Sequence, residues 1–352
     1  MTEFPENLED IKALYLRGTA IKEVSSSIQF LTRLCVLDMS GCSKLESLPE
    51  ITVPMESLQH LYLSKTGIKE IPSSFKHMIS LITLKLDGTP IKELPLSVKD
   101  MVCLEYLTLH GTPIKALPEL PPSLRFLTTH DCASLETVIS IINISSLWFR
   151  RDFTNCFKLD QKLLVAAMHL KIQSGQETPH GTIQIVLPGS QIPEWFGEKG
   201  IGSSLTIQLP SNCHQLKGIA FCLVFLLPLP SQDMPCEVDD DSYVHVYFDY
   251  LVKSKNGEND GGDEVVFASQ ERRALLYLLE TCDSDHMFLH YELGLVNHLR
   301  KYSGNEVTFK FYHEVYNQGR KLGHEIRKPF KLKNCGVYLH FDENLLADTD
   351  LP

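Results

Sequence analysis

The sequence predicts an α/β solenoid of short parallel strands, followed by an all-β domain built as an antiparallel sandwich. Two observations support this fold class. A leucine pattern recurs six times in the first 140 residues, and from residue 182 onward apolar and polar residues alternate with the period of two that is typical of strands. The chain has 352 residues, 43% hydrophobic and 22% charged, which is enough for two domains that each have a core.

The repeats share the template Leu-x-x-Leu-x-Leu-x-x-(Thr/Cys). Their second anchors are Leu14, Leu37, Leu61, Leu84, Leu107 and Leu127. These anchors are separated by 23, 24, 23, 23 and 20 residues, which is the period of leucine-rich repeats. The Leu-x-Leu pair predicts a short strand whose leucines face the core, and the Thr or Cys then turns the chain and can bond to the turn backbone. We therefore expect residues 1–140 to form a leucine-rich-repeat array of about six repeats.

The outer side of each repeat is short, and we expect a helical turn or two there. Residues 141–181 are predicted to hold a cap, a short helix and a linker. Apolar residues 139–149 form the cap, because an open solenoid end would expose its core. Apolar residues at helical spacing between positions 159 and 172 predict the helix, and polar residues 174–181 form the linker.

Side chains beside the strand leucines point outward, because side chains alternate along a strand. They form a ladder that mixes aromatic, charged and imidazole groups, which is the composition of a recognition surface. We predict ligand binding on this concave ladder through Tyr15, Arg17, Asp38, His60, Tyr62, Lys85, Asp87, Tyr106, His110 and His130. The alternative for any one of them is an ordinary solvated position.

Residues 182–345 are predicted to form the sandwich, and residues 346–352 a tail. Residues 183–187, 205–209, 243–251 and 307–315 alternate apolar and polar side chains, whereas residues 217–227 are nearly all apolar and suit a strand covered on both faces. Turn signals separate these runs, and no βαβ alternation appears. Residues 272–280 are expected to form a short helix.

The net charge of −11 argues against a nucleic-acid clamp and against docking on an anionic membrane. The N-terminal residues lack the apolar stretch of a secretory signal, and the longest apolar run, residues 219–229, is too short to span a bilayer. Ten scattered cysteines without a Cys-x-x-Cys pair indicate reduced thiols in the cytoplasm or the nucleus.

The chain shows no Gly-x-x-x-x-Gly-Lys-(Ser/Thr) loop, no Gly-x-Ser-x-Gly elbow and no His-Glu-x-x-His pair. Asp283, Asp285, His286 and His290 resemble a metal cluster if they lie on a helix, but the residues between the histidines favour a strand. In a strand the two imidazoles lie about 13 Å apart, so polar positions are the better interpretation. We expect no catalytic residue, no metal site and no cofactor.

The run at residues 187–196, Leu-Pro-Gly-Ser-Gln-Ile-Pro-Glu-Trp-Phe, resembles the signature of the C-JID domain, the jelly-roll/Ig-like domain that follows the repeats of plant TIR-type nucleotide-binding LRR disease-resistance receptors. Residues 153–160, 202–210 and 333–341 resemble further segments of that region, and the repeats at 41–49 and 88–95 are similar to those of the family. The signature residues are Pro188, Gly189, Ser190, Ile192, Pro193, Trp195 and Phe196.

Within the signature, we expect Pro188 and Pro193 to stiffen a turn and Gly189 to adopt a backbone angle closed to other residues. Trp195 and Phe196 either plug one end of the sandwich or project as a docking knob, and plugging is the interpretation we favour for Trp195.

The resemblance implies a module that recognises a pathogen effector or a guarded host protein and that works with a TIR-containing receptor. The TIR and nucleotide-binding parts of that family have no counterpart in the 352 residues, so we expect no enzyme activity from them. Two alternatives stay open. The chain is part of a longer receptor that hydrolyses NAD⁺ through its TIR domain, or it is an LRR interaction scaffold without a role in immunity.

Overall fold

The computed structural model describes residues 3–4, 10–138, 148–174, 182–226, 242–253, 265–268, 274–277, 284–317, 320–321, 328–329 and 332–341. The chain divides into two compact units, Met1–Met168 and His169–Pro352, which are called unit 1 and unit 2 below. In the described residues, no helix has the length and apolar character that a membrane span needs.

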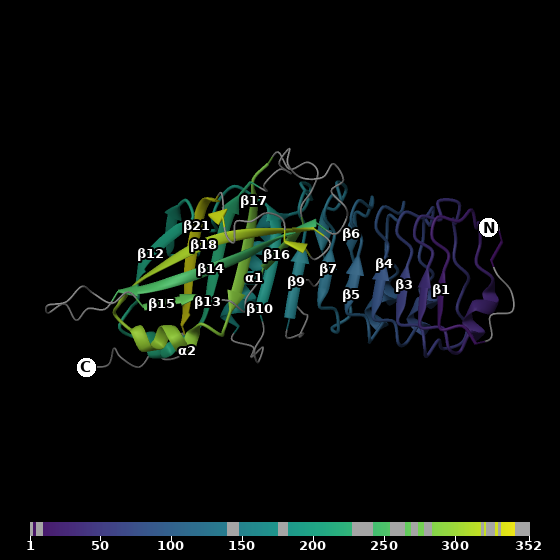
Figure 1. Cartoon of the computed structure of the whole chain (residues 1–352), viewed down its shortest axis with the longest axis horizontal. Coiled ribbons are helices and arrows are strands. Elements are labelled where there is room, and N and C mark those ends of the chain that lie inside the picture. Colours follow the sequence, from purple (N-terminus) through teal and green to yellow (C-terminus); the bar gives the residue numbers. More distant parts are fainter. Residues whose placement is uncertain are drawn as a thin grey trace. The chain divides into compact units, whose positions relative to one another are not determined.

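Seven short parallel strands in the described part of unit 1 stand side by side in chain order (Figure 1). They are β1 (Ala13–Tyr15), β2 (Val36–Asp38), β3 (His60–Tyr62), β4 (Thr83–Lys85), β5 (Tyr106–Thr108), β7 (Phe126–Thr128) and β9 (Trp148–Asp152). The register pairs the second anchor of each repeat with that of the next, for example Leu14 with Leu37 and Leu37 with Leu61. The predicted solenoid of parallel strands is confirmed. A second parallel pair joins β6 (Ala116–Leu117) to β8 (Thr137–Val138).

Each repeat turns at the residue four positions past its second anchor, and that residue has a positive φ. The turn residues are Gly18, Gly41, Lys65, Gly88, Gly111, Asp131 and Asn155. Glycine, aspartate and asparagine tolerate this conformation better than other residues do. The next residue closes the turn. The Thr66 hydroxyl donates to the Leu63 carbonyl of its own repeat, whereas the Cys42 thiol donates to the Leu16 carbonyl of the preceding repeat.

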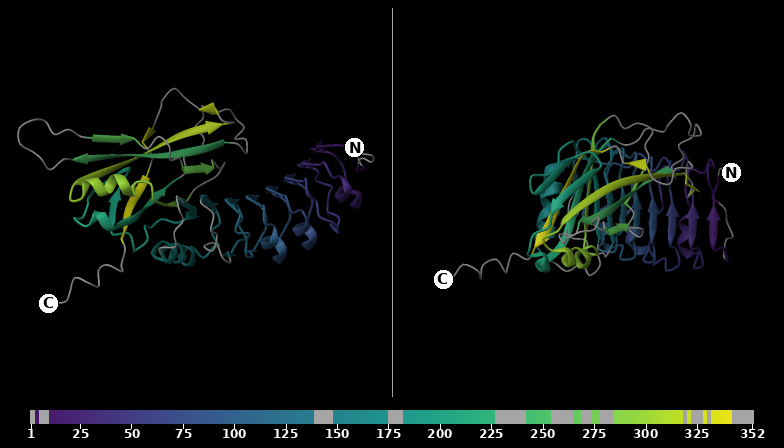
Figure 2. Two further views of the ribbon diagram at one scale, coloured as in Figure 1. Left: turned by 90° about the horizontal axis from the view of Figure 1, so that it is seen from below. Right: turned by 60° about the vertical axis from the view of Figure 1, so that its left-hand side comes forward.

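The outer side of unit 1 carries single turns of 3₁₀-helix, namely η1 (Ser26–Phe30), η2 (Ser73–His77) and η3 (Leu96–Asp100). Each buries one apolar side chain in the solenoid core, such as Phe75 in η2 and Val98 in η3. The left-hand view of Figure 2 shows that unit 1 curves, with its strands on the inner side and these helices on the outer side. The strands therefore form a concave face.

The parallel ladder extends beyond residue 140, where we expect the array to end. β9 pairs with β7 in the same register, and Trp148, Arg151, Phe153 and Cys156 stand at the four template positions. Arg151 occupies the place of a leucine and is fully buried. Its guanidinium donates to the carbonyls of Arg125 and Leu124 at 3.1 Å each. Most of the predicted cap, residues 139–147, lies outside the described residues.

The predicted helix is present as α1 (Gln161–Gln173). The Asp160 carboxylate accepts a hydrogen bond from the Leu163 amide at 3.0 Å and so caps the first turn. Leu164, Met168 and Ile172 recur every four residues and are buried, as helical spacing requires. The linker predicted after this helix, residues 175–181, lies outside the description.

Unit 2 consists of antiparallel sheets, which confirms the second part of the predicted fold; the jelly-roll/Ig-like class of the sandwich stays a prediction. The first sheet has the order β10 (Thr182–Pro188), β17 (His286–Glu292), β13 (Leu216–Phe225), β21 (Leu332–Phe341) and β11 (Glu198–Ile201). The second has the order β12 (Ser204–Gln208), β18 (Glu306–Asn317), β14 (Ser242–Lys253) and β15 (Val265–Ala268), with β16 (Ala274–Tyr277) on β14, and β19 (Arg320–Lys321) and β20 (Lys328–Pro329) on β18. Short helices η4 (Cys213–Gln215), α2 (Val296–Leu299) and η5 (Arg300–Tyr302) complete the unit.

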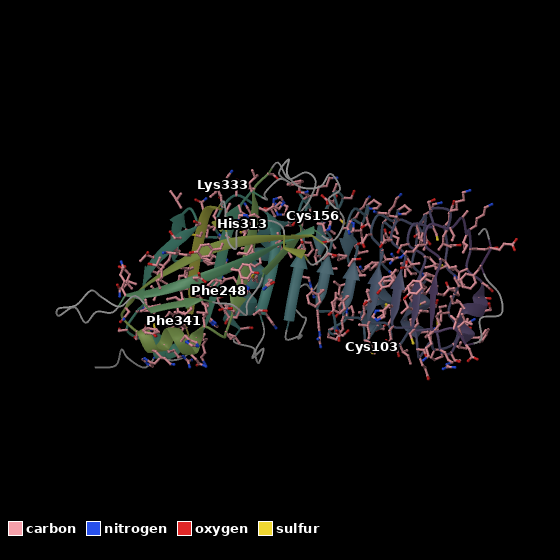
Figure 3. All side chains as sticks on the ribbon, viewed as in Figure 1. Cys103, Cys156, Phe248, His313, Lys333 and Phe341 are labelled. Atoms are coloured by element: carbon pink, nitrogen blue, oxygen red, sulfur yellow. The ribbon has the colours of Figure 1, made fainter. Side chains whose placement is uncertain are left out.

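Phe221 of the first sheet lies against Phe248 and Phe309 of the second, with ring centroids 4.8 and 5.2 Å apart (Figure 3 labels Phe248). The two sheets therefore enclose one apolar core. The strand β13 is buried at nearly every position, and β12 alternates exposed and buried residues, as their patterns predict.

The helix predicted at residues 272–280 is wrong. Residues 274–277 form β16, which pairs with β14 from Tyr243 to Val246. Ala and Leu favour helices, but the open edge of β14 offers four residues of ladder pairing, and this non-local pairing overrides the local preference.

Candidate ligand-binding face

The concave face of unit 1 is formed by the first and last residues of β1, β2, β3, β4, β5 and β7, whose side chains point outward. The residue two places after the end of each strand adds a third outward side chain. The strand pairing aligns the first two sets of positions into columns, and backbone bonds just beyond the strands, such as that from the Gly18 amide to the Ser40 carbonyl, align the third. The first column is Ala13, Val36, His60, Thr83, Tyr106 and Phe126, the second is Tyr15, Asp38, Tyr62, Lys85, Thr108 and Thr128, and the third is Arg17, Ser40, Ser64, Asp87, His110 and His130.

The two acidic residues of the face are buried. Asp38 has no exposed surface; its carboxylate accepts a hydrogen bond from the Ser40 amide at 3.0 Å and an ion pair from the Arg17 guanidinium. The bond from Ser40 is an Asx-type bond within one repeat, and the ion pair with Arg17 joins two neighbouring repeats. Asp38 therefore ties β1 to β2 and is not free to bind a ligand.

Asp87 is the most heavily bonded side chain of the face. Its carboxylate accepts hydrogen bonds from the Thr108 hydroxyl at 2.7 Å, from the Ser64 hydroxyl at 3.1 Å and from the His110 amide at 3.1 Å, and His110 Nδ1 lies 2.9 Å from Oδ1. Burial by itself raises the pKa of Asp87, but the bonds from His110, Thr108 and Ser64 outweigh it and lower that pKa. The carboxylate therefore connects three successive repeats.

Aromatic rings of adjacent strands lie flat against one another. Tyr106 and Phe126 stack with centroids 4.7 Å apart and planes 5° apart, and His110 and His130 stack at 4.5 Å and 8°. This packing fixes the rings before any ligand arrives. Binding then costs less conformational entropy than it does on a face of mobile side chains.

His130 is nearly buried, and its Nδ1 lies 2.9 Å from Asp131 Oδ2. Burial lowers the pKa of His130, but the hydrogen bond to Asp131 and the charges of Asp152 and Asp87 outweigh burial and raise it. Asp131 in turn accepts a hydrogen bond from Asn155 Nδ2 at 2.8 Å. Sequence reasoning missed Asn155, although it occupies the turn position of the same template in the seventh copy.

The predicted ligand-binding residues thus fall into three groups by exposure. Asp38, Asp87 and His130 are buried, and His60, Tyr62 and His110 are half-buried. Four are exposed: Tyr15 at 64%, Tyr106 at 39%, the Arg17 side chain at 71%, and Lys85. The Lys85 ammonium lies 5.5 Å from the centroid of the Tyr62 ring, in cation–π contact. The face therefore presents rings and cations to a partner and keeps its acids underneath.

The described residues include no cluster of three His, Cys, Asp or Glu side chains that could hold a metal ion. His286 and His290 both lie in β17, as expected for a strand, and are buried. Two cavities, of about 20 Å³ in unit 1 and about 10 Å³ in unit 2, have room for a water molecule at most.

The signature residues of unit 2 line the loop between β10 and β11. The Trp195 indole stacks on His169 of α1, with centroids 4.5 Å apart, and meets the Tyr338 ring of β21 edge-on at 5.1 Å. Phe196 is buried, at 1% exposure. A Cβ atom on Gly336 of β21 would lie 2.9 Å from Ile192 Cγ2, so that glycine makes room for the loop. Trp195 packs within unit 2 and does not project as a knob.

The expectation for Gly189 is wrong, because this residue does not adopt a positive φ. Its amide donates to the Asp285 carbonyl at 2.9 Å, which continues the pairing of β10 beyond Pro188. Pro188 is buried at the end of β10, Pro193 accepts a bond from the Phe196 amide in the loop, and Ser190 is exposed. His169, the stacking partner of Trp195, was not singled out from the sequence, since nothing in its helical spacing marks it.

Residues 187–345 match the family model of the C-JID domain, and residues 57–78 match a leucine-rich repeat. The chain carries leucine-rich repeats followed by a C-JID domain. Three disease resistance proteins of Arabidopsis thaliana are similar to it. RPS4B is 32% identical over 66% of this chain, RPS4 is 30% identical over 63%, and the disease resistance-like protein CSA1 is 30% identical over 80%.

The chain spans only 23%, 21% and 26% of the lengths of RPS4B, RPS4 and CSA1. Among solved structures, the leucine-rich repeat domain of the type III effector XCV3220 (XopL) is 25% identical, with a TM-score of 0.42 over 47% of this chain and 62% of that domain. The predicted relation of the repeats and the C-JID domain to plant disease resistance proteins is confirmed.

Proposed function

We propose that this chain is the ligand-recognition region of a plant intracellular immune receptor and that its concave face binds a protein. The observation that carries the proposal is the arrangement of Tyr15, Arg17, Lys85 and Tyr106, exposed on a face whose shape is fixed by buried hydrogen bonds. The similarity to disease resistance proteins supports the biological setting. The partner is a pathogen effector or a guarded host protein, met in the cytoplasm or the nucleus.

We also propose that none of the described residues has a catalytic role. The ionisable pair of His110 and Asp87 on the face is occupied by bonds between repeats, and the two hydroxyls beside it, of Ser64 and Thr108, both donate to the Asp87 carboxylate. In a receptor, ligand binding here acts on TIR and nucleotide-binding domains. Because the chain spans about a quarter of its relatives, a second candidate is that it is part of such a longer protein, whose NAD⁺ hydrolysis belongs to the TIR domain.

The test is affinity capture of the whole chain from infected and uninfected plant tissue, with two matched variants. Tyr62→Ala together with Tyr106→Ala removes rings from the face, whereas Tyr302→Ala removes a ring from unit 2. We expect an infection-dependent partner that the face variant loses and the unit 2 variant keeps. Partners that are equally abundant in both tissues and insensitive to the face variant contradict the proposal and favour a scaffold without a role in immunity.

A further inference from the structure

On the concave face the negatively charged side chains are buried and the positively charged side chains are exposed. Although the whole chain carries a net charge of −11, both carboxylates of the face, Asp38 and Asp87, are buried, while Arg17 and Lys85 are exposed. A partner that touches this face therefore meets cations first.

The charged hydrogen-bond acceptors of the face are likewise buried and already bonded, whereas its charged donors are exposed. The Asp87 carboxylate already accepts bonds from Thr108, Ser64 and His110, and Asp38 accepts from Ser40 and Arg17. The exposed charged groups are an ammonium and a guanidinium, which donate and cannot accept, and the exposed Tyr15 and Tyr106 carry hydroxyls that can do either. The partner must consequently supply acceptors, and charged acceptors make the stronger bonds.

The positions of Arg17 and Lys85 in the ladder fix the distance between the two exposed cations. Arg17 lies two residues beyond the end of β1, and Lys85 ends β4, three strands along the ladder. Three strand spacings and an offset of two residues along the strand separate their Cα atoms by about 16 Å. An extended chain covers that distance in about five residues. Tyr106 and its stacked neighbour Phe126 lie one and two strands further along, where they offer a flat apolar surface.

We infer that the concave face binds an extended acidic segment of a partner protein, with two carboxylates about five residues apart and an aromatic or aliphatic side chain next to the second. Arg17 and Lys85 bind the carboxylates, and the Tyr106–Phe126 stack packs on the apolar side chain. This inference rests on the proposed function and names the chemistry of the ligand.

The experiment measures binding of the full chain to fluorescein-labelled random copolymers by anisotropy. The probes are poly(Glu,Tyr), poly(Lys,Tyr) and an oligo-dT strand, the last as a source of phosphate charge. We expect binding to poly(Glu,Tyr) above the other two, weakening as salt screens the contacts. Lys85→Glu is expected to weaken it about tenfold, or about 1.4 kcal/mol.

Lys92→Glu is the matched control, because Lys92 is exposed, makes the same change in net charge and lies outside the face. It is expected to bind poly(Glu,Tyr) nearly as the unmodified chain does, and circular dichroism checks that both variants are folded. Equal losses in Lys85→Glu and Lys92→Glu, retention in both, or tighter binding of poly(Lys,Tyr) or oligo-dT overturns the inference.

The two proposals fail in different ways. A captured plant or pathogen ligand that depends on Tyr62 and Tyr106 but contacts the face through a basic segment overturns the acidic-segment inference and keeps the proposed function. A ligand that no variant of the face affects overturns the proposed function itself.

Discussion

His110 and His130 lie in face-to-face contact across two adjacent repeats, with their ring centroids 4.5 Å apart and each ring paired with a different carboxylate, Asp87 and Asp131. Each carboxylate lies 2.9 Å from Nδ1 of its imidazole, and Asp87 belongs to the repeat that precedes the repeat of His110. The concave face is therefore stabilised by a series of polar contacts between side chains in addition to the leucine core.

Asp87→Asn is expected to destabilise unit 1 by about 2 kcal/mol, because hydrogen bonds to a charged acceptor are lost while Thr108 and Ser64 stay in place. Urea unfolding followed by circular dichroism measures the change. Lys85→Gln, two residues away and exposed, is the control and should change stability by less than about 0.5 kcal/mol. Equal effects of the two variants would contradict the role assigned to the Asp87 carboxylate.

The stability of unit 1 is expected to be greatest near about pH 5. The pKa of His130 is raised in the fold, so its contribution is complete below the unfolded pKa of about 6.5 and is lost as pH rises through the folded value. The pKa values of Asp87 and Asp131 are lowered, so their contributions are present above about pH 3.9 and are lost as pH falls through the folded values.

Hydrogen exchange of peptides covering residues 104–132 at several pH values measures this dependence locally. His130→Asn should flatten the alkaline side of the profile and leave the acid side in place. A variant whose protection falls with pH as steeply as that of the unmodified chain would show that His130 does not carry the dependence.

Gly218→Ala is expected to destabilise unit 2 by about 1–3 kcal/mol, as overpacking of a filled core does. A Cβ atom at position 218 would overlap the hydroxyl oxygen of Tyr291, whose side chain is buried and bonded to His340 Nδ1 at 2.9 Å. In a double-mutant cycle, Tyr291→Ala should remove most of the penalty of Gly218→Ala. Additive effects of the two substitutions would show that the side chains at positions 218 and 291 do not contact each other.

Trp195→Ala is expected to lower the stability of unit 2 by about 2–4 kcal/mol, since it removes the contacts with His169 and Tyr338. Trp195→Phe keeps a ring there and loses an indole N–H that is buried without a partner among the described residues, so it should cost less than about 1 kcal/mol. Thermal unfolding compares the two. Ligand capture that Trp195→Ala abolishes at unchanged stability would instead favour the docking-knob interpretation.

The repeat pattern predicts most of unit 1, because strand position, core leucines and turn residues recur at fixed spacing. It does not reveal the seventh copy, since Arg151 stands where the template has a leucine. Its bonds to the Arg125 and Leu124 carbonyls stabilise the buried guanidinium there. Alternation predicts that Asp38 and Asp87 point away from the core. It does not predict their burial, because burial depends on neighbours 21 to 23 residues distant in the sequence.

In unit 2 the alternating runs predict β10, β12, β14 and β18, and the continuous apolar run predicts β13. Neither pattern shows which strand pairs with which. The helix expected at 272–280 shows the limit of local preference, since the edge of β14 decides that segment. The ligand-binding role of the ten ladder residues stays a prediction, and the structure refines it by separating the exposed from the buried ones.

The division of the concave face into exposed and buried layers has a consequence for how such a face can acquire a new ligand. Tyr15, Lys85 and Tyr106 are exposed, and none of the hydrogen bonds between repeats described above involves their side chains. Asp38 and Asp87, in contrast, join neighbouring repeats. Randomising the outer positions while holding the two aspartates constant should yield libraries in which most members fold. The same scaffold can therefore be redirected to a different target by exchanging a few surface side chains.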